Sequence, residues 1–153
     1  MDALIEFSQT GDLGPLRKDM TAVEVVQLLG PPDSSRWIQG DDNFQRYRYG
    51  SLSLTFRRRT GDPAGDENLL LRSLSLSFKR LPFELPEQVA SQLECDWTSA
   101  RLEDVLAVFQ QANVAAVKDH DSSEHGRNFQ RYRVGERRVL LNAFDGVAAD
   151  IAG

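Results

Sequence analysis

The feature of this sequence that most constrains its fold is an octapeptide that occurs twice. Residues 43–50 read Asn-Phe-Gln-Arg-Tyr-Arg-Tyr-Gly, and residues 128–135 differ only in having valine at the seventh position. The copies lie 85 positions apart, which exceeds the units of about 20 to 50 residues that stack into solenoids. We therefore predict one compact body in which a single structural unit is used twice.

The first half of the chain predicts a helix followed by strands. Thr21 and Glu24 have the spacing of a capping box, and Gly30 followed by two prolines stops a helix, so we predict a helix over 22–29. Residues 40–43 resemble a turn, and 60–67 form a polar loop. Alternation of apolar and polar residues predicts strands over 44–49, 51–57 and 73–78.

The second half repeats this order. Pro86 fits the first turn of a helix that ends near 94, and a second helix begins near 99. Residues 120–127 are predicted to form a turn, and Asp145-Gly146 to form a tight hairpin turn. The predicted extended segments are 114–118, 129–134, 139–143 and 147–151.

These elements predict an α+β fold with two tandem repeats of helices plus antiparallel sheet. The repeats span approximately 1–80 and 81–153 and form one pseudo-symmetric domain. The sequence leaves open whether the two sheets join edge to edge or pack as separate lobes.

Composition limits the classes of partner and the compartment. A chain of 153 residues with 41% hydrophobic residues can bury a real core, and its net charge of −5 disfavours general binding to nucleic acid. The single Cys95 excludes an internal disulfide, and the first residues lack a signal-peptide pattern, so we expect a cytoplasmic protein. No apolar run approaches the length of a membrane span.

The repeated strands place arginine and tyrosine on opposite faces. Period-two alternation puts Tyr47 and Tyr49 on one face and Arg46 and Arg48 on the other, and the second copy behaves alike. Serines alternate with the core leucines of the next strands, so small hydroxyls should lie beside these arginines. We predict a partner-binding set consisting of Arg46, Arg48, Arg57, Arg131, Arg133 and Trp37.

Each member of this set has a plainer interpretation. An antiparallel sheet commonly has one solvated face, on which arginine needs no further role. Large aromatic residues usually lie mostly buried, so core packing is the stronger alternative for both Trp37 and Trp97.

The first half also resembles a known fold. Residues 16–32 read Leu-Arg-Lys-Asp-Met-Thr-Ala-Val-Glu-Val-Val-Gln-Leu-Leu-Gly-Pro-Pro, followed by a tryptophan and a tyrosine-rich strand. Over about the first 60 residues this resembles the Met-Thr, Val, Leu-Gly, Pro pattern of the small β-barrel-assembly lipoproteins (small protein A) and the related β-lactamase inhibitory protein-like fold. The resemblance implies a helix-backed sheet, duplicated in the inhibitor-like members, whose open face holds another protein.

Other chemistries have weaker patterns. His120 and His125 lie in a segment rich in Asp, Ser and Glu, but their spacing matches no established zinc motif. Cys95 reads as a small structural residue rather than a catalytic thiol. The basic clusters 57–59 and 137–138 are the candidates for contact with nucleic acid, but the first leads directly into the acidic loop 62–67, so local neutralisation of charge is its simpler role. We assign no catalytic residue, no metal ligand and no cofactor.

The sequence thus favours a non-enzymatic protein-binding module, in its sharpest form an immunity-type protein that neutralises a bacterial toxin or effector. The acidic segment around Glu84, Glu87, Glu94 and Asp96 would suit a basic partner. Two alternatives stay open: a metal-dependent hydrolase that uses His120 and His125, and a homo-oligomeric scaffold or assembly subunit. We expect no nucleic-acid or membrane partner, and the oligomeric state is left open.

Overall fold

All strands of the described chain belong to one antiparallel sheet. The computed structural model describes residues 2–38, 41–79, 83–93, 101–124 and 126–153. The sheet has the order β1-β2-β3-β4-β8-β7-β6-β5, so the consecutive strands β1 to β4 and β5 to β8 join through β4 and β8. The strands are β1 Ser34–Ile38, β2 Asp41–Tyr49, β3 Leu52–Arg58, β4 Leu69–Ser77, β5 Ala116–Glu124, β6 Arg127–Val134, β7 Val139–Phe144 and β8 Val147–Ala152.

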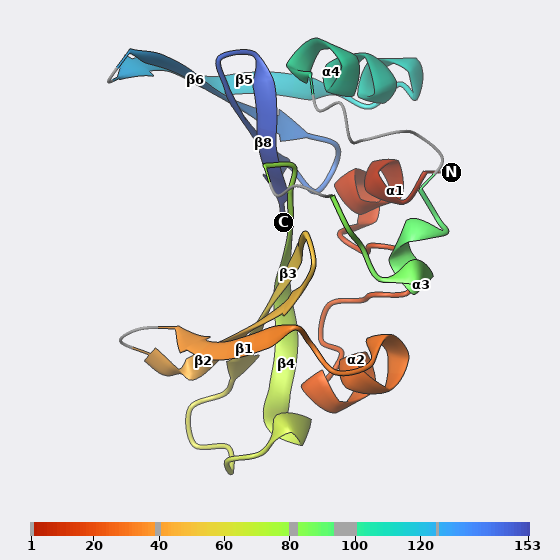
Figure 1. Cartoon of the computed structure of the whole chain (residues 1–153), viewed down its shortest axis with the longest axis vertical. Coiled ribbons are helices and arrows are strands. Elements are labelled where there is room, and N and C mark those ends of the chain that lie inside the picture. Colours follow the sequence, from red (N-terminus) through yellow and green to blue (C-terminus); the bar gives the residue numbers. More distant parts are fainter. Residues whose placement is uncertain (1, 39–40, 80–82, 94–100, 125) are drawn as a thin grey trace.

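The helices lie on one side of this sheet. They are α1 Ala3–Thr10, α2 Ala22–Leu29, α3 Glu87–Ala90 and α4 Leu102–Gln111, with a short 3-10 turn, η1 Asp66–Asn68, before β4. In Figure 1 the hairpins β1–β2 and β5–β6 extend to the left, away from the helices. One face of the sheet is therefore packed under helices, and no described helix covers the other face. This confirms an α+β fold with an antiparallel sheet.

Local chemistry explains the predicted elements. Thr21 Oγ1 accepts a hydrogen bond from the Glu24 amide at the start of α2, and Gly30 ends the helix with a φ of 81°. The Asp145-Gly146 turn between β7 and β8 has φ angles of 51° and 76°, which is typical of a two-residue hairpin turn. The helix and this turn are thus confirmed.

The core lies between the helices and the covered face. Alternate residues of β3 point into it, and Phe56 is 0% exposed. Leu4 and Phe7 of α1 and Phe109 of α4 are buried against the same layer. Burial of each such side chain contributes about 1.5–3 kcal/mol, which makes this layer the main stabilising element.

Two predicted turns were wrong, and α1 was not predicted. Residues 41–43 continue β2 rather than form a turn, and 120–124 continue β5. Both segments belong to hairpins at the ends of the sheet, where strands pair through backbone hydrogen bonds without needing apolar side chains. Helix α3 ends at Ala90, while the predicted boundaries near 94 and 99 lie outside the described residues.

The glycine that closes each octapeptide has a structural role. Gly50 and Gly135 have φ angles of 57° and 72°, and a segment from elsewhere in the chain crosses each of them. A Cβ atom at Gly50 would lie 2.5 Å from the carbonyl oxygen of Glu84, and one at Gly135 would collide with the carbonyl of Ser8. These two positions therefore require glycine.

Among the described residues, no helix combines the length and the apolar character needed to cross a membrane.

Candidate functional site

The face of the sheet that no described helix covers, called the open face below, is the candidate functional surface. Its residues alternate with buried residues such as Leu54 and Leu141 on the covered face. One cross-strand row runs over the open face through all eight strands of the sheet. In order, it contains Ser34, Arg48, Ser53, Ser75, Ala152, Leu140, Arg133 and Val117.

The middle of this row is made of small side chains. Ser53, Ser75 and Ala152 separate Arg48 on one side from Leu140 and Arg133 on the other. Five strand spacings of ~4.8 Å place the two arginines about 24 Å apart across the sheet. A partner can therefore approach the backbone at the centre while long cationic side chains lie on both sides.

The structure divides the partner-binding set predicted from the sequence. The five predicted arginines lie on the open face: Arg46, Arg48, Arg57, Arg131 and Arg133. Trp37 pairs with Gln45, which pairs with the buried Phe56, so Trp37 faces the other side of the sheet. Trp37 is 47% exposed, and the Arg58 guanidinium lies 5.3 Å from the centroid of its ring. The interpretation of Trp37 as a core residue was therefore wrong. Trp97 lies outside the described residues.

The arginines of the second copy are paired within the chain. Arg131 Nε donates a hydrogen bond to Asp119 Oδ1 at 3.0 Å, and Arg133 Nε lies 2.6 Å from Asp119 Oδ2. The Asp119 side chain is 22% exposed. The hydrogen bond from Arg131, together with the charges of both arginines, outweighs partial desolvation and lowers the pKa of Asp119.

A β-bulge places this carboxylate. Lys118 pairs with Tyr132 and His120 pairs with Arg131, so Asp119 is an extra residue in β5 with no partner in β6. Such an insertion bends the strand and redirects a side chain. Here it brings the Asp119 carboxylate against both arginines, a contact that sequence spacing alone did not reveal.

The arginines of the first copy have a different environment. In β1 no extra residue separates Ser34 from Trp37, and Arg36 lies directly opposite Arg46. Among the side chains that the structure describes, which leave out those of residues 41, 42 and 124, no carboxylate lies within ion-pair distance of Arg36, Arg46 or Arg48. Like charges directly opposite each other on neighbouring strands are destabilising. Among the described side chains, one carboxylate therefore offsets part of the charge of the motif in the second copy, whereas in the first copy a third arginine adds to that charge.

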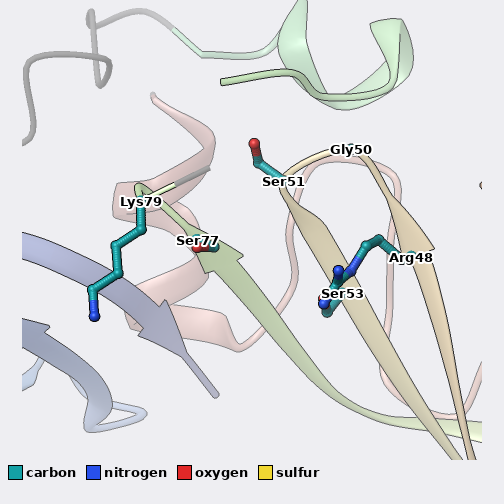
Figure 2. A pocket seen from close by; sticks show the side chains of 6 residues that line it. All are labelled: Arg48, Gly50, Ser51, Ser53, Ser77 and Lys79. Atoms are coloured by element: carbon teal, nitrogen blue, oxygen red, sulfur yellow. The ribbon is translucent and has the colours of Figure 1, made fainter. Parts of the chain in front are cut away.

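A hollow of about 410 Å³ adjoins the first copy. It is lined by Arg48, Gly50, Ser51, Ser53, Ser77 and Lys79. Figure 2 shows Arg48 reaching from β2 over Ser53 of β3, while Lys79 extends from beyond Ser77 toward the strands of the second half. Two cations and hydroxyl groups that donate hydrogen bonds suit an anionic group.

A second hollow, of about 440 Å³, shares Lys79 with the first. It also contains Arg127, Phe144 and Val147. The Lys79 Nζ atom and the Arg127 guanidinium lie 4.2 Å and 4.8 Å from the centroid of the Phe144 ring. Both cations are attracted to the face of the Phe144 ring, and phenylalanine and arginine are residue types enriched at protein interfaces.

Charge is distributed unevenly between the two sides of the molecule. The four helices contain five carboxylates and neither lysine nor arginine. The acidic net charge of the chain therefore does not describe the open face. An acidic partner is expected on the open face, whereas the sequence had pointed to a basic partner for the acidic segment that begins at Glu84.

The predicted histidine site is only partly described. His120 lies on β5 opposite Arg131, and its ring centroid is 5.6 Å from that of Phe129. His125 and Cys95 lie outside the described residues. Within the described part of the chain, no group of three or more His, Cys, Asp or Glu side chains is arranged to hold a metal ion.

No protein-family model, no curated protein and no solved structure matches this chain.

Proposed function

We propose that this protein is a non-enzymatic protein-binding module whose open face holds an acidic surface of another protein. One observation carries the proposal. Five cations lie on a face without a covering helix, and none of them is within ion-pair distance of a carboxylate whose side chain the structure describes, residues 41, 42 and 124 being outside that set. They are Arg36, Arg46, Arg48, Arg57 and Lys79.

The shape of the open face supports this proposal. Small residues at its centre let a partner come close, and arginine binds carboxylates through two parallel hydrogen bonds. Arginine and aromatic residues are enriched at protein interfaces, and Phe129 and Phe144 lie 5.1 Å apart, centroid to centroid, on this face. The β-lactamase inhibitory protein-like fold, which the N-terminal segment resembles, also holds its partner on an open sheet face.

The narrower form of the proposal is an immunity-type protein that neutralises a bacterial toxin or effector. We also propose that the two groups of four strands are copies of one unit, related by pseudo-symmetry. In support, Thr21 before α2 forms a bridge to Leu70 of β4, and Arg101 before α4 forms a bridge to Val147 of β8. A single cysteine supports a location in the cytoplasm.

Affinity capture with two charge-reversal variants tests the proposal. Tagged wild-type protein is incubated with a lysate of its native host and bound proteins are identified by mass spectrometry. The test variant, Arg46→Glu with Arg48→Glu, reverses the charge at two positions of the open face. The control, Arg137→Glu with Arg138→Glu, makes the same change in net charge near α1, where the Arg137 amide bonds to Ser8.

The proposal predicts one stoichiometric partner that binds the wild type and the control but not the test variant. Circular dichroism must show that both variants are folded. With the purified partner, calorimetry should show weaker binding at higher ionic strength, because salt screens exposed charges. Equal capture by all three proteins would show that the partner binds elsewhere. Recovery of only this chain, with a mass that rises with concentration, would indicate self-assembly.

A further inference from the structure

We propose that Arg36, Arg46 and Arg48 form a binding site for one carboxylate, supplied by an aspartate or glutamate side chain of the partner. The source of the carboxylate rests on the proposed function above. The site itself follows from the second copy of the motif, where a pair of arginines at the same spacing binds a carboxylate of the chain.

The second copy is an internal precedent for the ligand. Arg131 and Arg133 are two residues apart on β6 and point to the same face. Asp119 lies between them, with one carboxylate oxygen 3.0 Å from Arg131 Nε and the other 2.6 Å from Arg133 Nε. One carboxylate thus satisfies both arginines of an Arg-Tyr-Arg strand.

The first copy offers the same geometry. Arg46 and Arg48 occupy the same positions in the octapeptide, on a strand that also has a neighbour on each side. Residues two apart on a strand lie ~6.6 Å apart, so both copies space their arginines alike. The tyrosine between them faces the core in both copies, which sets the orientation of the arginines.

The neighbouring strand makes the difference between the copies. β5 has the bulge that supplies Asp119, whereas β1 has Arg36 opposite Arg46. Three arginines are therefore neighbours on the open face of the first copy, where the second copy has two arginines and a carboxylate. An external carboxylate would relieve this repulsion and complete the arrangement that the second copy makes within the chain.

The surroundings leave room for such a group. Ser53 and Thr55 lie opposite Arg48 and Arg46 on β3, and neither has a bulky side chain. Arg48 also lines the 410 Å³ hollow with Ser77 and Lys79, so the site continues into a cationic recess. An acidic residue on a protruding segment of the partner fits this position.

Nuclear magnetic resonance of the arginine side chains tests the site directly. The probe is hexa-aspartate, acetylated and amidated at its ends, titrated at low salt into ¹⁵N-labelled protein; hexa-asparagine is the neutral control. We expect the Nε–Hε signals of Arg46 and Arg48 to shift and saturate, and those of Arg131 and Arg133 to stay in place. In the Asp119→Asn variant, the signals of the second pair should respond as well.

Two results of the titration would overturn the proposal. The first is no shift at Arg46 and Arg48, or equal shifts at all exposed arginines, including Arg59 and Arg101. The second is saturation of the Arg46 and Arg48 signals at a lower concentration of inorganic phosphate than of hexa-aspartate. The ligand of the site would then be a phosphate group and not a carboxylate.

A gain-of-carboxylate variant keeps this test separate from the proposed function. Arg36→Asp replaces the third guanidinium group with a carboxylate directly opposite Arg46, and should weaken hexa-aspartate binding at least tenfold. Arg59→Asp, in the loop after β3, makes the same charge change and should leave binding unaltered. If Arg36→Asp blocks hexa-aspartate but not the captured partner, the carboxylate site exists and the partner does not use it. If the partner is lost although hexa-aspartate never binds, the open face docks without this site.

Discussion

Replacing Gly50 with alanine tests whether the glycine of the repeated octapeptide is structural. Gly50 has a φ of 57°, and the alanine Cβ would lie 2.5 Å from the Glu84 carbonyl oxygen. The Ser51 amide donates to that same oxygen at 2.7 Å, and the Glu84 amide donates to Ser51 Oγ at 3.1 Å. The segment at Glu84 must therefore move, and both hydrogen bonds weaken when it does.

The cost can be estimated from these contacts. The left-handed conformation costs alanine about 1 kcal/mol. The two weakened hydrogen bonds add about 1 kcal/mol each, for a total of about 3 kcal/mol. For a domain of this size, that loss corresponds to a Tm lowered by about 6–12 °C.

Gly146→Ala is the matched control. Gly146 has a φ of 76°, and no heavy atom lies within 4 Å of its ideal Cβ position. The free energy of unfolding of the control should therefore fall only by the cost of the left-handed conformation for alanine, about 1 kcal/mol. Urea unfolding, monitored by far-ultraviolet circular dichroism, measures the free energy of unfolding of both variants. The slope of this free energy against urea concentration should be unchanged, because both variants expose the same surface on unfolding. Equal losses within about 0.5 kcal/mol would refute the argument, because the Glu84 contact would then cost nothing.

Two further predictions follow from ionisable groups. Since Arg131 lowers the pKa of Asp119 in the folded state, the carboxylate stabilises the fold above about pH 4, and this contribution is lost as the pH falls through the lowered pKa. Wild-type stability should therefore fall more steeply with acid than that of Asp119→Asn, and parallel curves would contradict this. Burial raises the pKa of Tyr49 to about 12, so its stabilising effect should be lost as the pH rises from about 10 toward that value. Tyr49→Phe should remove the tyrosinate absorbance step near pH 12. It also deletes the 2.9 Å hydrogen bond that the Tyr49 hydroxyl donates to the Gly30 carbonyl oxygen, which should lower the free energy of unfolding by about 1 kcal/mol. An unchanged absorbance titration would contradict the assignment of this step to Tyr49.

Several elements were predictable because their causes are local. The Thr21 cap, the Gly30 stop and the period-two alternation of β3 involve neighbours in sequence, and all three agree with the structure. Helix α1 was missed although Asp2 Oδ1 accepts from the Leu4 amide and Gly11 ends it with a φ of 84°. Those capping signals are local, so the sequence of the first eleven residues does encode this helix.

The candidate site was predictable only in part. Alternation placed the five arginines on one face, because side chains of a strand point to opposite sides in turn. The position of Trp37 depended on the register between β1 and β2, and the exposure of its ring on how far the helices extend over the sheet. Neither property is encoded in the spacing of residues near Trp37.

The sequence by itself determined the repeated octapeptide, the α+β class and the arginine-bearing face of the strands, because capping, alternation and glycine turns act over a few residues. Tertiary structure decided that β4 and β8 join the two groups of strands into one sheet, since that pairing brings together segments far apart in the chain. It also decided the charge state of each motif. One extra residue in β5 places Asp119 against Arg131 and Arg133, while the register of β1 places Arg36 opposite Arg46. Identical Arg-Tyr-Arg sequences are therefore partly neutralised in one half and gain a further positive charge in the other.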